Sequence, residues 1–320
     1  MPEHKLSRRE FIRMAGIAAS AAALGACTSP QTPNPPTVAV PTATSTPIPT
    51  PTIVPTPTIE VVVEAGGIEM VLVEGGSFQM GSTIGFGREQ PVHTVTFANP
   101  FYIARYELTF EQYDVFCDDT GQPKPDDAGW GRENLPVINV NWYDALEYCN
   151  WSSEREGLLP CYTIEGLASQ CDFTANGYRI PTEAEWEYAA RGGQRSQGYT
   201  YAGSDDYDEV AWYLENSGEQ SHPVGQKGPN ELGLYDMSGN VREWCWDWYN
   251  REYYTLTSSD DPPGPEIGRG ILGRQKIQRG GDFWNPVDLL RASARGFDGP
   301  QVRNAYGVSS QGFRIVRTAL

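Results

Sequence analysis

The chain has 320 residues, with 24 Lys or Arg against 41 Asp or Glu, so its formal net charge is −17. This acidic balance argues against nucleic acid as a partner, because phosphate contacts need a basic surface. The length could hold one large domain or two small ones, and the composition along the chain favours one.

Residues 1–26 have the pattern of an export signal. Basic side chains precede an uncharged, alanine-rich run from residue 15 to 26: Lys5, Arg8, Arg9 and Arg13. The run is shorter than the roughly 20 apolar residues that a spanning helix needs, so we predict cleavage rather than a permanent span. Arg8-Arg9 resembles a twin-arginine export motif, and residues 24–27 resemble a lipobox, which predicts acylation of the Cys27 thiol. The alternative is a chance arginine pair beside a structural cysteine.

Loss of residues 1–26 removes four basic and two acidic side chains, which leaves 20 basic against 39 acidic and a net charge of −19. A protein this acidic is not attracted to anionic lipid head groups. Membrane attachment would therefore come from acyl chains. Residues 27–60 are mostly Pro, Thr, Ala, Val and Ser, which predicts a semi-extended linker. We therefore expect an exported, membrane-anchored lipoprotein, extracytoplasmic or at the cell surface, with its folded domain in residues 61–320.

Three helices are predicted in this domain from their capping residues. Thr109 with Gln112 forms a capping box before an amphipathic segment. Asn141 has the side chain to begin a second helix. Thr182 with Glu185 has the pattern of a third helix start. The two glutamates at that third start, residues 183 and 185, are therefore expected to be structural, since carboxylates are favourable near a helix N-terminus.

The second and third helices should end near Gly157 and Gly192. Strands are predicted at Met70–Val73, Val92–Phe97 and Gly312–Val316. The remainder is rich in loops, so the expected class is α+β with a low content of regular structure.

Six cysteines are present, and acylation of Cys27 would leave five, so at least one thiol stays free or pairs between molecules. Cys161 and Cys171 are the predicted disulfide, because they flank a possible turn at Gly166 and an oxidising compartment permits the bond. Cys117 and Cys149 lie on predicted helix faces, where buried free thiols are expected.

Ordered sequence blocks across residues 68–317 resemble the formylglycine-generating-enzyme (sulfatase-modifying factor) family. The blocks are residues 75–81, 91–93, 106–109, 136–145, 178–192, 233–244, 279–281 and 312–314. The resemblance implies a C-type-lectin-like fold with a small mixed sheet under long loops. It also implies a structural Ca²⁺ site built from backbone carbonyls and one carboxylate, with Ser238, Gly239, Val241 and Glu243 at the ligand positions, since oxygen ligands suit this ion. A capped turn is the competing interpretation of the same loop.

The chemistry departs from the resemblance. The family's oxidase needs two cysteine thiolates for copper(I), and the matching positions here are Asn285 and Leu290, so we expect no copper. A branch resembling the ergothioneine-type sulfoxide synthases needs three histidines, whereas only His93 and His222 lie beyond residue 26. A Gly-x-Ser-x-Gly motif for a hydrolase is also missing from the sequence.

We therefore favour a binding module over an enzyme. Residues 282–311 resemble the variable region of proteins diversified by retroelements, in which Glu, Lys, Gln, Met and Trp cannot arise. Residues 280–320 contain no Glu, Lys or Met, with Trp284, Gln301 and Gln311 as the exceptions. This segment should be displayed on one face and contact an unknown protein or glycan ligand. The expected contact residues are Asp282, Phe283, Trp284, Asn285, Phe297, Asp298, Asn304, Tyr306, Ser309 and Ser310. Arg291 and Arg295 are assigned to the structural frame.

The alternative is an oxidoreductase, or an accessory protein of sulfatase maturation, with an unrecognised metal site. Carboxylate oxygens of the kind that bind a hard metal ion are present at Asp282, Asp288 and Asp298. The spacing of these residues does not support such a site.

Overall fold

The computed structural model describes residues 61–63, 67–256, 260–266, 268, 274–303 and 308–319. These residues belong to one compact unit, Thr56–Leu320. The lipidation site predicted at Cys27 and the predicted linker lie outside the described residues, as do Asn304 and Tyr306. No helix in the described part of the chain has the length and apolar character needed to cross a membrane.

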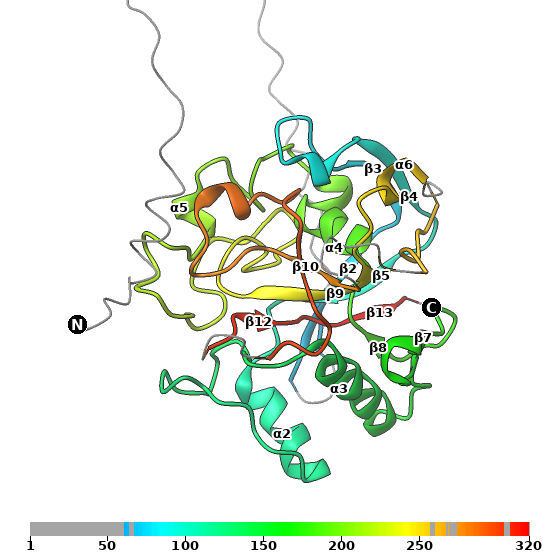
Figure 1. Cartoon of the computed structure of the whole chain (residues 1–320), viewed down its shortest axis with the longest axis vertical. Coiled ribbons are helices and arrows are strands. Elements are labelled where there is room, and N and C mark those ends of the chain that lie inside the picture. Colours follow the sequence, from blue (N-terminus) through cyan, green and yellow to red (C-terminus); the bar gives the residue numbers. More distant parts are fainter. Residues whose placement is uncertain are drawn as a thin grey trace, which may run out of the picture. The chain divides into compact units, whose positions relative to one another are not determined.

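Two sheets organise the domain (Figure 1). The larger has the order β1-β2-β5-β13-β8, made of Val61–Val63, Glu69–Val73, Phe101–Ala104, Val316–Thr318 and Tyr178–Arg179. The second has the order β11-β10-β9-β12, made of Gly296–Asp298, Lys276–Arg279, Arg242–Trp248 and Gln311–Gly312. Two short hairpins complete the strands: β3 (Gly76–Met80) with β4 (His93–Phe97), and β6 (Tyr162–Thr163) with β7 (Gln170–Cys171).

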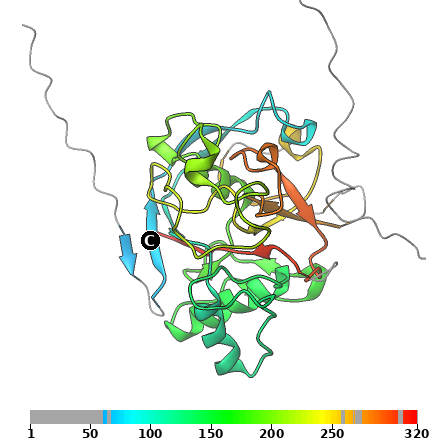
Figure 2. The ribbon, with the colours of Figure 1, turned by 90° about the vertical axis from the view of Figure 1, so that its left-hand side faces the viewer.

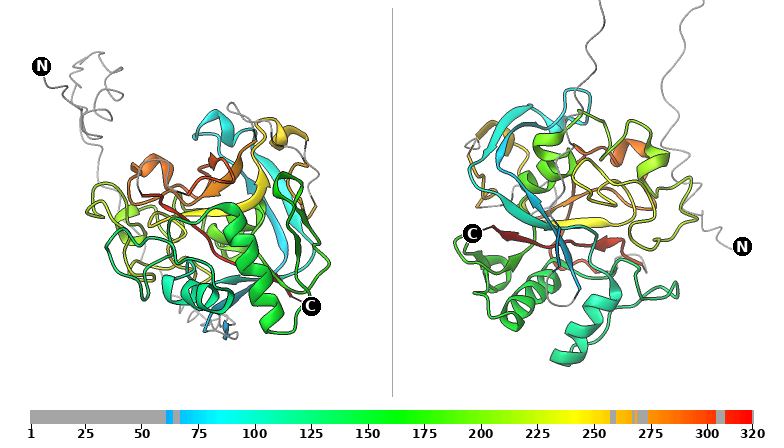
Figure 3. Two further views of the ribbon diagram at one scale, coloured as in Figure 1. Left: turned by 60° about the horizontal axis from the view of Figure 1, so that its bottom comes forward. Right: turned by 180° about the vertical axis from the view of Figure 1, so that it is seen from behind.

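The helices are short and few. They are α2 (Phe110–Thr120), α3 (Trp142–Arg155), α4 (Glu183–Ala190), α5 (Tyr207–Val210) and α6 (Tyr253–Leu256). Single 3-10 turns lie at η1 (Gly87–Glu89), η2 (Gly166–Ala168), η3 (Gly193–Arg195) and η4 (Val287–Leu289). In Figures 1 and 3 the red strands β12 and β13 run between α2 and α3 on one side and the orange segment on the other. The fold is α+β, as expected.

All three predicted helix starts are confirmed. Thr109, Asn141 and Thr182 each accept a hydrogen bond from the backbone N–H three residues on, and the side chain at that third position returns the contact. Each pair satisfies two backbone donors that the first turn of a helix cannot pair internally. Local sequence therefore determines where the helices begin.

The strand predictions are confirmed at β2 and β4 and wrong at the C-terminus. The sequence suggested one strand over Gly312–Val316, but the chain leaves one sheet after Gly312 and enters the other at Val316. β12 pairs in parallel with β9, whereas β13 pairs antiparallel with β5 and β8. Between them, the carbonyls of Phe313 and Ile315 accept hydrogen bonds from residues 108 and 104. An alternating pattern cannot show such a change of sheet.

The predicted disulfide is not formed, because Cys161 and Cys171 are both free thiols. In the β6–β7 hairpin, Cys171 lies opposite Tyr162 rather than Cys161. Adjacent residues of a strand direct their side chains to opposite faces, so the two sulfur atoms are directed apart. The Cys161 thiol donates instead to the Gly177 carbonyl at 3.3 Å.

Five buried arginine–carboxylate pairs stabilise the domain, four of them between distant parts of the chain, and we call this set the arginine frame. Its pairs are Arg179–Glu185, Arg279–Glu187, Arg291–Glu89, Arg295–Glu183 and Arg314–Glu243. Arg314 donates from Nε and Nη2 to the two oxygens of Glu243, each at 2.6 Å. Arg291 and Arg295 are thus structural, as the sequence indicated, and so are Glu183 and Glu185.

Candidate functional site

The C-terminal segment is packed more deeply than the sequence suggested. Phe283 has 0% relative exposure and meets Trp130 edge to face at 5.3 Å between ring centroids. Its backbone N–H donates to the Asn240 carbonyl, which fixes the chain against the interior. The expectation that Phe283 contacts a ligand is therefore wrong, because its ring is part of the core.

Four polar residues of the expected surface are also buried, and three of them meet at Arg242. Asp282 accepts from Nε of Arg242 at 2.8 Å and from Oγ of Ser310 at 2.6 Å. Asn285 accepts from Nη2 of Arg242 at 3.1 Å. The fourth, Ser309, is buried beside Asn139, whose side chain accepts from its N–H at 2.7 Å. The structure thus brings Asp282, Asn285 and Ser310 together, but as supports of Arg242 rather than as free donors.

Trp284, Phe297 and Asp298 keep partial exposure. Phe297 packs on Tyr249 with ring centroids 4.1 Å apart. One carboxylate oxygen of Asp298 accepts from Nε2 of Gln311 at 3.2 Å. The N–H of Trp284 donates to Asp282 at 2.9 Å, and the Phe297 ring lies 5.9 Å from the Arg88 guanidinium, so these two aromatic residues lie close to Asp282 and Arg88.

A small pocket lies in this region, with a volume of about 60 Å³. Its lining includes Arg88 from η1, Arg242 from β9, Gln278 from β10, Asn285, Arg295 and Gly296. We call it the guanidinium pocket, because three arginine side chains line it. Its volume is sufficient for one small polar group.

The three guanidinium groups are opposed by two carboxylates. Arg295 pairs with Glu183, and Arg242 pairs with Asp282. Arg88 has no carboxylate partner in the described part of the chain, and its Nε donates to the Arg295 carbonyl at 2.6 Å. Burial lowers the pKa of Arg88, the neighbouring Glu89 opposes this, and the charges of Arg295 and Arg242 lower it further. The pocket therefore carries a positive charge that an anion would offset.

Gln278 gives the pocket an unsatisfied polar side chain. It is 1% exposed, and neither Oε1 nor Nε2 has a hydrogen-bond partner among the described residues. A buried polar group without a partner costs about 1–3 kcal/mol, so such groups are rare in stable folds. An anion in the pocket would accept from Nε2 together with the neighbouring guanidinium groups. The lining is thus suited to a ligand that accepts hydrogen bonds.

The carboxylate proposed for calcium, Glu243, already has a cationic partner. Both oxygens of Glu243 are bonded to Arg314, and Oε2 also accepts from Nε1 of Trp186 at 2.7 Å. A cation at this carboxylate would lie against a guanidinium in bidentate contact. The Ser238 hydroxyl donates to the Leu290 carbonyl at 2.8 Å. Across the described ranges, no group of three or more His, Cys, Asp or Glu is arranged to hold a metal.

Backbone hydrogen bonds hold the same loop in place. The loop contains Gly239 and Val241, the two remaining residues proposed for calcium. The N–H of Gly239 donates to the Gly280 carbonyl, and that of Val241 donates to Glu107 at 3.0 Å. Gly239 has a φ of 83°, and an added Cβ would lie 2.2 Å from the Trp212 carbonyl oxygen. This position therefore needs glycine for close backbone approach. The capped-turn interpretation describes the loop better than a calcium site.

The positions that match the copper thiolates have other roles. Asn285 lines the guanidinium pocket, and Leu290 is fully buried against aromatic residues near α5. Neither side chain offers the sulfur that copper(I) prefers, so these residues do not fit the metal.

Residues 60–319 match the family described as the sulfatase-modifying factor enzyme 1-like domain. The chain belongs to this family. The chain is 39% identical to the chaperone protein LppX of Paenibacillus barcinonensis over 284 residues. These residues cover 78% of this chain and 89% of LppX. The formylglycine-generating enzyme of Streptomyces coelicolor is 29% identical, over 67% of this chain and 78% of the enzyme.

Solved structures share the fold of this family member. Treponema denticola variable protein 1 superposes with a TM-score of 0.68 at 30% identity, over 82% of this chain and all of that chain. PvdO from Pseudomonas aeruginosa superposes with a TM-score of 0.63 at 26% identity, over 81% and 98% of the two chains. The C-type-lectin-like fold implied by the sequence blocks is thus confirmed.

Sequence reasoning missed three residues of the guanidinium pocket. Arg88, Arg242 and Gln278 come from three separate parts of the chain, and no local pattern links them. One signal was present, because Arg242 is a charged residue inside the block from Gly239 to Trp244, which otherwise packs in the core.

Proposed function

We propose that the chain is an exported ligand-binding protein, and that its guanidinium pocket holds a carboxylate of a polypeptide ligand. The observation that carries the proposal is the unsatisfied amide of Gln278 beside three guanidinium groups opposed by two carboxylates. A carboxylate accepts from several donors at once, and arginine matches its geometry.

The pocket volume limits what enters it. About 60 Å³ admits a single group, so the ligand would insert one acidic side chain or a chain terminus. The half-buried Trp284 and Phe297 lie next to Asp282 and Arg88, and they offer rigid aromatic area to the rest of such a ligand. This arrangement supports binding through one acidic group buried in the pocket, with weaker contacts around it.

A polypeptide is favoured over other carboxylates by the relatives. The protein that is 39% identical over most of both chains carries the name chaperone, and a chaperone acts on polypeptides. We further propose export through Arg8-Arg9 and anchoring through Cys27, from the pattern of residues 1–27. The ligand would then be an extracytoplasmic polypeptide.

The test uses the full-length chain and two unstructured, fluorescently labelled peptides. One peptide contains several Asp and Glu, and the other has Asn and Gln in their place. We expect the acidic peptide to bind at least about tenfold more tightly, which corresponds to about 1.4 kcal/mol. Arg88→Gln should remove this preference.

The matched control is Arg155→Gln, which changes an exposed arginine at the end of α3 that does not line the pocket. It should bind like the unaltered chain. Equal affinity for the two peptides, or equal losses in both variants, would contradict the proposed function.

A further inference from the structure

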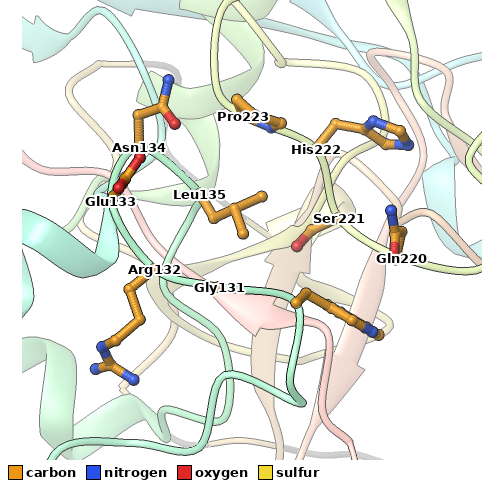
Figure 4. Close-up of a pocket in the computed structure, with 10 residues that line it drawn as sticks. Gly131, Arg132, Glu133, Asn134, Leu135, Gln220, Ser221, His222 and Pro223 are labelled. Carbon is orange, nitrogen blue, oxygen red and sulfur yellow. The ribbon is translucent and has the colours of Figure 1, made fainter.

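A second and larger pocket lies apart from the residues of the guanidinium pocket. It has a volume of about 380 Å³ and lies between residues 130–135 and residues 220–223 (Figure 4). Ligand-binding cavities for small molecules begin at about 300 Å³, so this one is large enough for a sugar ring or two. Neither the family match nor the relatives' names assign a ligand to it.

Ser221 is the unexplained feature of this pocket. The residue is 2% exposed, and its Oγ has no hydrogen-bond partner among the described residues. In Figure 4 the hydroxyl oxygen is directed toward the space near Leu135 and Gly131. A hydroxyl both donates and accepts, so its natural complement is a group that does the same. Another hydroxyl is such a group.

The walls of the pocket supply apolar surface with a fixed orientation. Trp130 is half-buried, and Phe283 braces its indole ring edge to face at 5.3 Å. Leu135 is buried at the base, and its backbone N–H donates to the Arg132 carbonyl. A rigid aromatic ring offers area at low entropic cost and receives C–H groups on its face. The buried Phe283 therefore holds the Trp130 ring in place.

The charged side chains that line the pocket do not favour an anion. Arg132 donates from Nε to Asp114 at 2.7 Å, and Figure 4 shows its guanidinium directed away from Ser221. His222 stacks on Trp212 at 3.8 Å, and its Nε2 lies 2.7 Å from the Ser217 carbonyl oxygen. The rim adds the exposed carboxylate of Glu133, which would repel a negative ligand.

We infer that this pocket binds a neutral saccharide, with a sugar ring against Trp130 and a sugar hydroxyl paired with Ser221. The exposed amides of Asn134 and Gln220 lie on the rim and suit the remaining hydroxyl groups. A peptide carbonyl would only accept from the Ser221 hydroxyl, whereas a sugar hydroxyl both donates and accepts, so a peptide fits the pocket less well. This site is independent of the guanidinium pocket and of the function proposed for it.

The test is saturation-transfer NMR on the full-length chain with six neutral sugars: glucose, galactose, mannose, N-acetylglucosamine, cellobiose and chitobiose. At least one should receive magnetisation from the protein. Ser221→Ala should weaken its binding about tenfold without lowering the melting temperature, because it removes an unpaired buried hydroxyl. Trp130→Ala should abolish transfer, while Ser196→Ala, a change at an exposed serine outside the pocket, should have no effect.

Three results would overturn the inference. They are no transfer to any of the six sugars, transfer that persists in both pocket variants, and transfer to N-acetylprolinamide in place of the sugars. The last would assign an apolar peptide ligand. Binding of the acidic peptide in the same variants keeps the two sites apart, because neither Ser221 nor Trp130 lines the guanidinium pocket.

Discussion

Arginine has different roles in the arginine frame and in the guanidinium pocket. In the frame every guanidinium meets a carboxylate, as in Arg179 with Glu185, where both contacts are 2.6 Å and both residues are buried. In the pocket Arg88 lacks a carboxylate partner among the described residues, and the side chain of Arg242 is 27% exposed. Arg295 belongs to both sets, so the lack of a carboxylate partner at Arg88 and the exposure of Arg242 are what distinguish the pocket from the frame.

The comparison also shows why the two regions respond differently to substitution. Removal of one member of a buried pair leaves its partner charged and desolvated, which is strongly destabilising. Removal of Arg88, which has no carboxylate partner among the described residues, relieves repulsion between guanidinium groups and leaves no carboxylate without a cation. The four predictions below test this contrast, from the largest expected effect to the smallest.

Glu243→Ala should break the frame at its most buried pair. Arg314 would keep its charge at 0% exposure with no carboxylate in contact, and Trp186 would lose its acceptor. We expect a loss of about 3–5 kcal/mol in the free energy of unfolding, measured by urea denaturation. The control Asp114→Ala breaks the more exposed contact with Arg132 and should cost about 1 kcal/mol or less. Similar losses in the two variants would contradict the contrast.

Asp236 should make stability depend on pH. Burial raises its pKa to about 6, and nearby Glu243 adds to this while Arg314 opposes it. The folded state therefore binds this proton more tightly than the unfolded chain, whose carboxyl has a pKa of about 3.9. Its stabilising contribution is complete below that value and is lost as the pH rises through 6, by at most about 3 kcal/mol.

We thus expect the melting temperature to fall between pH 4 and pH 6 and Asp236→Asn to reduce that fall. Asn tolerates the φ of 58° at this position, so the backbone should be preserved. An unchanged pH dependence in the variant would assign the effect to other groups.

Gln278→Met should stabilise the fold while it weakens binding of the acidic peptide. The substitution removes two buried polar atoms that have no described partner, so we expect a gain of about 1 kcal/mol in urea denaturation. Gln278→Glu is the sharper variant, because it places a carboxylate of the protein itself among the guanidinium groups. It should block the peptide without unfolding the chain. A destabilised methionine variant would mean that the amide is satisfied after all.

Chelation should have the smallest effect. Because Arg314 rather than a metal neutralises Glu243, addition of EDTA should shift the melting temperature by less than about 1 °C. Addition of millimolar CaCl₂ should be equally neutral in a thermal scan. A clear rise with calcium would restore the metal interpretation of this loop.

Sequence was informative where the interaction is local. The capping boxes at Thr109 and Thr182 span four residues each, and the sequence predicts both. The segment after Gly312 was misread, because its sheet changes through contacts with residues far away in the chain. The burial of Phe283 was missed for the same reason, since its partner Trp130 lies in another loop.

The candidate site was predictable only in part. Asp282, Asn285 and Ser310 were named from a segment with unusual composition, and the structure brings them together at Arg242. Their roles depend on Arg242 itself and on Arg88, which the same composition argument could not reach. Charge balance in a pocket is a property of three-dimensional neighbours, so no linear pattern reports it.

The edge position of β1 has a mechanical consequence. This three-residue strand is held by antiparallel pairing to β2 at one margin of the larger sheet (Figure 2). Tension on the chain before residue 61 would load these pairs one after another, as in the opening of a zipper. To extract β2 the same tension would also have to shear its four pairs with β5. β1 would therefore yield first under load and lengthen the chain before the domain, and the two pockets would keep their shape while the domain is pulled.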